Sequence, residues 1–315
     1  MRYSLAIPMI LLMCGCSKAP EAVHAAHMTS PAAKPVVVDA EFWKIWGDGQ
    51  AELAGYDLTY PRYGQLRMGV AVTIFVSETF SNQLRVKADE GKHPASDQYP
   101  VMKLNLIQDF QTGIYDYNNM TSTFAALAAV NGRPAGSPTK VSFSEQEWCG
   151  HVYQQLLFDA SAVRSQSHSY FDGEGDQDKQ LSYPEGGVTE DQLPLWARGM
   201  AAPVLAVGEK REVMLLPALQ SVRHAHKPIE WKQATLSRTA GSGDTEIYSA
   251  KFEGFERKFT VEKAAPHRIL RWETSAGERA ELLKSARLKY WQMHNEGGEA
   301  ALAQLGLHRR AARTP

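Results

Sequence analysis

Long stretches of the chain alternate apolar and polar residues with a period of two. Residues 68–76 show this most clearly, because every even position there is apolar. A second alternating run begins at Ala51, and the turn-forming letters YPRYGQ separate the two runs. Since successive side chains of a strand point to opposite faces, this pattern predicts a β-hairpin with long strands.

The same alternation of apolar and polar residues continues towards the C-terminus. Residues 101–127 predict two strands around a turn at 111–113, and residues 140–159 and 165–181 predict an antiparallel pair. Further strands are predicted within residues 208–275. Residues 277–291 favour a helix by propensity, but they follow a strand and the turn SAG, so we interpret them as a returning strand.

Helix signals are few. In VTEDQLPLWARGM, Thr189 and Gln192 have the spacing of a capping box, and EGGEAALAQLGL predicts a short terminal helix. Because the strands do not alternate with helices, a doubly wound parallel sheet is disfavoured. The predicted fold is mainly β: one or two large curved antiparallel sheets, as an open barrel or sandwich, with a few short helices.

The N-terminus predicts export and lipid attachment. Arg2 precedes a short apolar run, and a small residue stands directly before Cys16, which resembles a bacterial lipobox. Residues 1–15 are therefore predicted to be a lipoprotein signal peptide and Cys16 the acylated first residue. An uncleaved anchor, or a plain signal cut elsewhere, are the alternatives.

The remaining chain then divides simply. Residues 16–40 are rich in Ala and Pro and predict a flexible tether. Residues 41–307 predict a β-rich globular domain, with the alternative of two halves joined near 184–203. Residues 308–315 form a basic tail.

Location and partners follow from the leader and the charge. By resemblance to enterobacterial lipoproteins, Ser17 after the cysteine favours the outer membrane, with the protein facing the periplasm. The membrane is then a partner through the lipid anchor. The formal net charge of -1 gives no reason to expect nucleic acid as a partner. No nucleotide-binding motif is present, so no cofactor is predicted.

Cys149 and His151 in QEWCGH are the candidate catalytic pair. Once Cys14 leaves with the leader and Cys16 is acylated, Cys149 is the one free thiol of three cysteines. In a strand, residues 149 and 151 would share a face about 6.5–7 Å apart, beyond a direct thiolate–imidazole bond. We therefore interpret Cys149 as a packed strand residue, with Glu147 and Tyr153 on the same face.

Two segments offer candidate metal ligands. The run YFDGEGDQDKQL superficially resembles a calcium loop, but Gln177 and Tyr183 stand where that pattern needs Gly and Glu, so we interpret it as a solvated turn. His224 and His226 could share one metal, yet no third ligand is near in sequence, and we interpret them as exposed. The candidate ligands of the acidic run are Asp172, Glu174, Asp176 and Asp178.

Four blocks carry a resemblance to a known group of proteins: QEWCGHVYQQL, DFQTGIYDYNNMTSTF, SYFDGEG and PHRILRWE. Together they resemble a family of exported bacterial proteins whose members often carry the label septum formation inhibitor Maf. True Maf proteins are cytoplasmic nucleotide pyrophosphatases with a Ser-x-Ser-x-Arg motif, which does not follow the leader here. The resemblance therefore implies fold and location and no mechanism.

The leading functional hypothesis is a non-enzymatic, membrane-anchored lipoprotein that binds an apolar or amphipathic ligand, or an envelope protein, on the concave face of its sheet. A cell-envelope hydrolase or transferase using Cys149 with a histidine is the first alternative. A structural or assembly lipoprotein without a ligand is the second.

Overall fold

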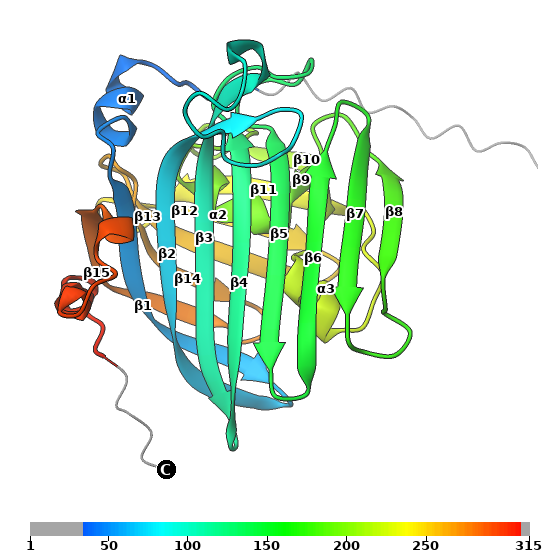
Figure 1. Cartoon of the computed structure of the whole chain (residues 1–315), viewed down its shortest axis with the longest axis vertical. Helices are drawn as coiled ribbons and strands as arrows, with labels where there is room; N and C mark the ends of the chain where they lie inside the picture. Colours follow the sequence, from blue (N-terminus) through cyan, green and yellow to red (C-terminus); the bar gives the residue numbers. More distant parts are fainter. Residues whose placement is uncertain (1–33, 310–315) are drawn as a thin grey trace, which may run out of the picture. The chain divides into compact units, whose positions relative to one another are not determined.

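The computed structural model describes residues 34–309, which lie within a single compact unit (Figure 1). The predicted leader and Cys16, and most of the basic tail, lie outside the described residues. The described end of the predicted tether is packed: Lys34 forms a β-bridge with Val204, and the side chain of Val36 is buried. The packed chain therefore begins no later than Lys34, before the boundary predicted at 41.

A single sheet of fifteen strands dominates the described residues. The strands of its first half are β1 (Ala51–Arg62), β2 (Gln65–Ser81), β3 (Gln98–Thr112), β4 (Tyr115–Ala126), β5 (Pro138–Glu147), β6 (Gly150–Phe158), β7 (Ala162–Ser169) and β8 (Gln177–Ser182). Those of its second half are β9 (Val188–Thr189), β10 (Lys210–Leu216), β11 (Lys232–Ala240), β12 (Thr245–Phe252), β13 (Phe255–Glu262), β14 (Ile269–Thr274) and β15 (Arg279–Leu288).

The two series of strands join where β1 pairs antiparallel with β15. The order across the sheet runs from β8 down to β1, then from β15 down to β9, and only the short pair of β9 with β10 is parallel. The predicted fold class is confirmed: the fold is mainly β, one large open and mostly antiparallel sheet with a few short helices. Strands on both sides of residues 184–203 belong to this one sheet.

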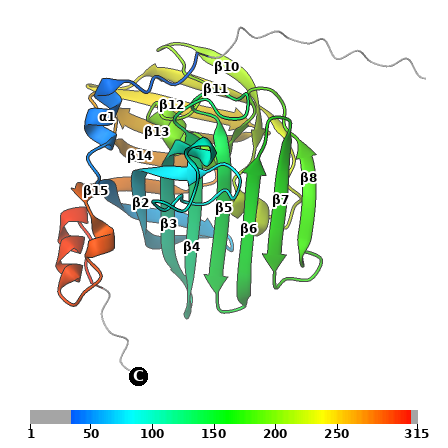
Figure 2. The same cartoon turned by 45° about the horizontal axis from the view of Figure 1, so that its top comes forward.

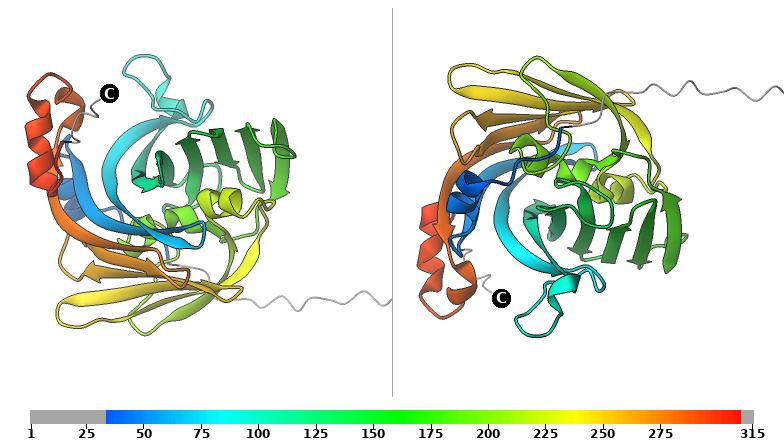
Figure 3. Two further views of the ribbon diagram at one scale, coloured as in Figure 1. Left: turned by 90° about the horizontal axis from the view of Figure 1, so that it is seen from below. Right: turned by 90° about the horizontal axis from the view of Figure 1, so that it is seen from above.

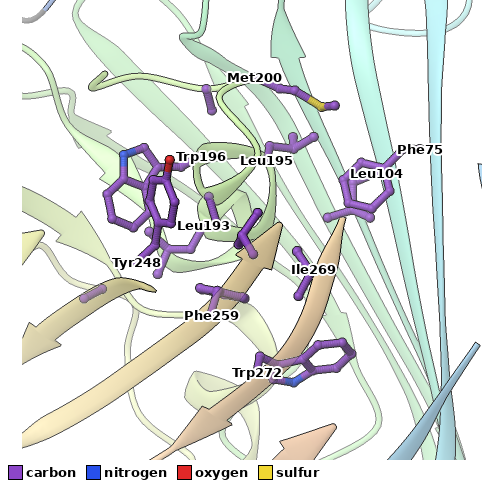
Figure 4. Packing of buried hydrophobic residues seen from close by; sticks show 14 of the residues in the cluster. Phe75, Leu104, Leu193, Leu195, Trp196, Met200, Tyr248, Phe259, Ile269 and Trp272 are labelled. Carbon is purple, nitrogen blue, oxygen red and sulfur yellow. The ribbon is translucent and has the colours of Figure 1, made fainter. Parts of the chain in front are cut away.

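The sheet curls around the helices α2 (Leu193–Ala197) and α3 (Leu219–His224), as the end-on views of Figure 3 show. Trp196 of α2 packs edge-on against Tyr248 at 5.1 Å, within a core that also contains Phe75 and Trp272 (Figure 4). The concave face of the sheet is thus filled by the chain's own side chains.

Other segments cover parts of the opposite, convex face. The 3-10 helix η4 (Gly298–Leu305) places Leu305 on an apolar cluster with Leu53 and Ile74. The remaining short helices are α1 (Ala40–Trp46), η1 (Ala95–Asp97), η2 (Glu190–Gln192) and η3 (Tyr290–Gln292). The convex face of β3 to β7 is left open to solvent over its central part.

Several local predictions are confirmed. Thr189 and Gln192 form the predicted capping box at η2, the segment 279–288 is a strand, and a short helix occupies 298–305. The first hairpin turns at Tyr63 and Gly64, both with positive φ, as the tight turns between long strands require. No helix within residues 34–309 is both long and apolar enough to cross a bilayer.

Asp191 of η2, whose carboxylate accepts from the backbone N–H of Leu219 at the start of α3, should make stability pH-dependent. Burial, assisted by the neighbouring Glu190, raises the pKa of its carboxyl from 3.8 to about 7. The protonated carboxyl therefore stabilises the folded protein fully below the pKa of the unfolded state. This stabilisation is lost as the pH rises through the pKa of the folded state. We expect wild type to lose roughly 2–3 kcal/mol of unfolding free energy between about pH 5 and pH 8 through this group. The Asp191→Asn variant should lack this component, as urea denaturation at both pH values can measure; an identical pH dependence in the two proteins would contradict it.

Candidate functional site

The QEWCGH block is a hairpin turn, which corrects the interpretation of Cys149 as a packed strand residue. β5 ends at Glu147 and β6 begins at Gly150, so Trp148 and Cys149 form the two-residue turn. Both turn side chains are exposed. Because the turn interrupts the alternation, Glu147 points into the interior, whereas the paired Gln146 and His151 point outwards.

Cys149 is not held as an activated nucleophile. Its backbone N–H donates to the carboxylate of Glu147 at 2.7 Å. The same carboxylate raises the pKa of the thiol, with a smaller contribution from desolvation. A raised pKa disfavours the thiolate that cysteine catalysis needs. His151 lies on the convex face within β6, whereas Cys149 lies in the turn that joins β5 to β6.

A groove with a volume of about 760 Å³ lies on the convex face of β3 to β7. Strand pairing builds its floor from two rows of side chains. One row runs Ile107, Met120, Ser144, Tyr153 and His168; the other runs Asp109, Asn118, Gln146 and His151, with Tyr170 at its end. The alternation that buries residues 141 and 143 therefore exposes the groove side chains.

The groove combines apolar contact surface with polar groups. Met120, Tyr153 and Tyr170 expose large side chains in it, beside the amide of Asn118 and the imidazole of His168. The ring of Tyr170 lies directly over Gly150, where any larger residue would overlap it. A hollow of this size, with aromatic surface and a few polar groups, is typical of sites that bind small molecules by complementarity.

The acidic run does not converge on a metal site. Asp176 pairs with His168 at 3.0 Å, Asp178 pairs with Arg164, Glu174 contacts His226 and Arg223, and Asp172 is exposed. Within residues 34–309, no group of three or more His, Cys, Asp or Glu side chains is arranged to hold a metal ion. His168 and Asp176 instead line one end of the groove.

His224 and His226 also separate, and His224 is not the exposed loop histidine that the sequence indicated. His226 is exposed and contacts Glu174. His224 ends α3 and lies mostly buried behind the groove, where its Nε2 is 2.5 Å from the carboxylate of Glu145. The hydroxyl of Tyr60 lies 3.1 Å from its Nδ1.

This Tyr60–His224–Glu145 chain ties α3 to the back of the groove strand β5. Burial lowers the pKa of His224, although Glu145 acts in the opposite direction. A neutral imidazole with its proton on Nε2 satisfies both contacts, since Nε2–H donates to Glu145 and Nδ1 accepts from Tyr60. Arg223 lies beside the same carboxylate, with its Nε 3.7 Å away.

The sequence analysis did not predict the contacts among Tyr60, His224 and Glu145, although one signal for them was present. Glu145 continues the alternation of Val141 and Phe143, so it occupies a position that the strand pattern assigns to the interior. A carboxylate on a buried face needs a partner. The partner, 79 residues away along the chain, has no sequence signature.

No protein-family model, curated protein or solved structure matches this chain. The resemblance to the exported family labelled Maf therefore stays a prediction.

Proposed function

We propose that the protein is a membrane-anchored lipoprotein that acts by binding, and that the groove on β3 to β7 holds an amphipathic ligand. The observation that carries this proposal is the composition of the groove floor. Met120, Tyr153 and Tyr170 offer apolar surface, and Asn118 and Gln146 offer amide donors and acceptors beside them. A ligand with an apolar part and a polar part can satisfy both kinds of surface at once.

The concave face, where the sequence analysis placed the ligand, is occupied by the protein's own core, which corrects that expectation. The side chains of α2 and of the surrounding strands pack there as the main hydrophobic core, and the cavity next to them has a volume of only about 30 Å³. That space suits about one water molecule and no larger ligand. A ligand on the convex face also leaves the buried contacts among Tyr60, His224 and Glu145 intact, so these side chains still support β5 from behind.

Blocking the groove should remove the ligand without unfolding the protein. We expect the Tyr153→Arg variant of the full chain, extracted in detergent, to lose a lipid-like molecule that mass spectrometry finds with wild type. Tyr153 is 39% exposed, so the longer, charged arginine side chain can be placed there without disturbing the core.

Met214→Arg is the matched control, because Met214 is 37% exposed on β10, outside the groove. It should retain the ligand. Equal retention by both variants would exclude the groove as the site. Loss of a co-purifying protein instead of a small molecule from Tyr153→Arg would make the groove a protein-binding surface.

A further inference from the structure

One end of the sheet carries most of the apolar side chains with the highest exposure. Of the eight large hydrophobic side chains that are at least 57% exposed in residues 34–309, six lie at this end. They lie in, or next to, every second hairpin connection, those between β1 and β2, β3 and β4, β5 and β6, and β7 and β8. Tyr63, Leu66, Ile114, Trp148 and Tyr170, with Met68 behind them, form what we call the tip surface.

The tips lie together because of the topology. In a run of antiparallel hairpins, every second connection falls at the same end of the sheet. Figures 1 and 2 show the turns between β3 and β4, β5 and β6, and β7 and β8 along the lower edge. The register of β1 with β2 places Tyr63 at the corresponding end of its hairpin, and the hydroxyl groups of Tyr63 and Tyr117 are 2.7 Å apart.

We propose that the tip surface inserts into the interfacial layer of a lipid bilayer. The side chains project from separate turns, so a folded partner would need a separate pocket for each. A fluid bilayer closes around each of them without such a match. Trp and Tyr are also the residues that gather at membrane interfaces, where the ring is buried and its polar group stays hydrated.

Charge near the tips fits the phosphate layer of a membrane. Arg62 and Arg67 flank the first tip, and neither forms an ion pair with a carboxylate in the described residues; Arg62 donates to the hydroxyl groups of Tyr63 and Tyr117. A lipid phosphate can supply a further counter-charge, because guanidinium groups bind phosphate oxygens with two parallel bonds. Asp172, exposed after Tyr170, offsets part of this positive charge, so the proposal does not require strongly anionic lipid.

The chain between the predicted lipid anchor and Lys34 is long enough for the tips to face the membrane that holds the anchor. Lys34 lies with Val204 near the connection between β4 and β5, at the end of the sheet opposite the tips. Cys16 and Lys34 are eighteen residues apart, which spans at most about 60 Å when fully extended, and the fifteen residues of β3 span about 50 Å. If Cys16 is acylated, as predicted, the tips can therefore reach the bilayer that holds the anchor.

Two exposed tryptophans allow a direct test in the full chain. Trp148 lies on the tip surface and is 63% exposed, whereas Trp291 is 45% exposed beyond β15, whose last residues pair with the start of β1 at the opposite end. The protein is returned to phosphatidylethanolamine vesicles that contain brominated phosphatidylcholine. Emission assigned to Trp148, by difference from Trp148→Phe, should lose most of its intensity; emission assigned to Trp291, by difference from Trp291→Phe, should not.

A second pair of variants guards against an effect of Trp148 alone. Ile114→Asp, on another tip and 76% exposed, should restore much of the Trp148 emission in brominated vesicles, whereas Leu84→Asp at the opposite end should not. Equal quenching of Trp148 and Trp291 would overturn the proposal. So would a Trp148 emission that follows protein concentration and ignores bromine, which would indicate a protein on the tips. Retention of ligand by the groove is a separate readout, so either proposal can fail alone.

Discussion

Replacing Arg198 with methionine is expected to lower the free energy of unfolding by about 3–5 kcal/mol, the cost typical of breaking a buried ion pair. The guanidinium donates to both oxygens of Glu52, at 2.7 and 3.0 Å, and to the carbonyl of Pro266 at 2.8 Å. The two side chains are 1% and 4% exposed. Methionine would leave the Glu52 carboxylate buried in β1 without a counter-charge.

Two further variants separate this cause from a general loss of packing. Arg198→Met combined with Glu52→Leu removes both charges, and should recover most of the lost stability because apolar pairs replace buried ion pairs at little cost. Arg164→Met breaks an exposed pair with Asp178 and should cost less than about 1 kcal/mol. Urea denaturation measures all three. A single Arg198→Met effect no larger than that of Arg164→Met would show that the buried pair adds nothing.

The position of Arg198 explains why its effect should be large. It follows the last residue of α2, the helix that fills the concave face, and it stacks on Phe75 of β2 with 4.2 Å from the guanidinium carbon to the ring centre. One side chain therefore joins α2 to β1 and β2. Losing it loosens the helix against the sheet that it supports.

Local features of the fold could be predicted from the sequence because their causes are local. The alternation in residues 68–76 and the turn before it depend on neighbouring residues alone, and so does the capping box of Thr189 and Gln192. Residues 279–288 show the limit, since their propensity favours a helix. Pairing with β1 and β14 makes them a strand, and only the preceding turn indicated this.

The single sheet could not be predicted in the same way. It depends on β1 pairing with β15, which joins Ala51 to Leu288 across most of the chain. Nothing near either residue specifies the other. The alternation therefore predicts strands and their faces, but it leaves open whether they form one sheet or two.

The candidate site was predicted less well than the fold, for a related reason. A two-residue turn at Trp148 and Cys149 reverses the chain, so extending the strand pattern through it put Glu147 on the wrong face. His151 and Tyr153, both beyond the turn, do share a face as predicted, and both line the groove. Glu145 and His224 meet because α3 packs against β5, and this tertiary contact has no local signature in the sequence.

The second large effect is expected at Glu145. Its replacement by alanine should lower the free energy of unfolding by about 3 kcal/mol, because buried His224 loses its acceptor and buried Arg223 loses a neighbouring negative charge. The Nε2–H of His224 donates to this carboxylate, and Arg223, 4% exposed, lies beside it. Glu174 then remains as the carboxylate near Arg223, 3.5 Å away on the connection between β7 and β8.

Comparison with glutamine tests which part of Glu145 matters. Glu145→Gln keeps an acceptor for His224 and loses only the charge, so it should cost about half as much as alanine. Glu212→Ala removes an exposed carboxylate from β10 and should change stability by less than about 0.5 kcal/mol. Ser144 and Gln146, the neighbours of Glu145, face the groove. Loosening β5 should therefore also reduce ligand retention in the alanine variant more than in the glutamine variant. Equal losses in the two variants would show that the charge alone, and not the hydrogen bond to His224, carries the effect. Wild-type stability and retention in both variants would show that Glu145 supports neither the fold nor the groove.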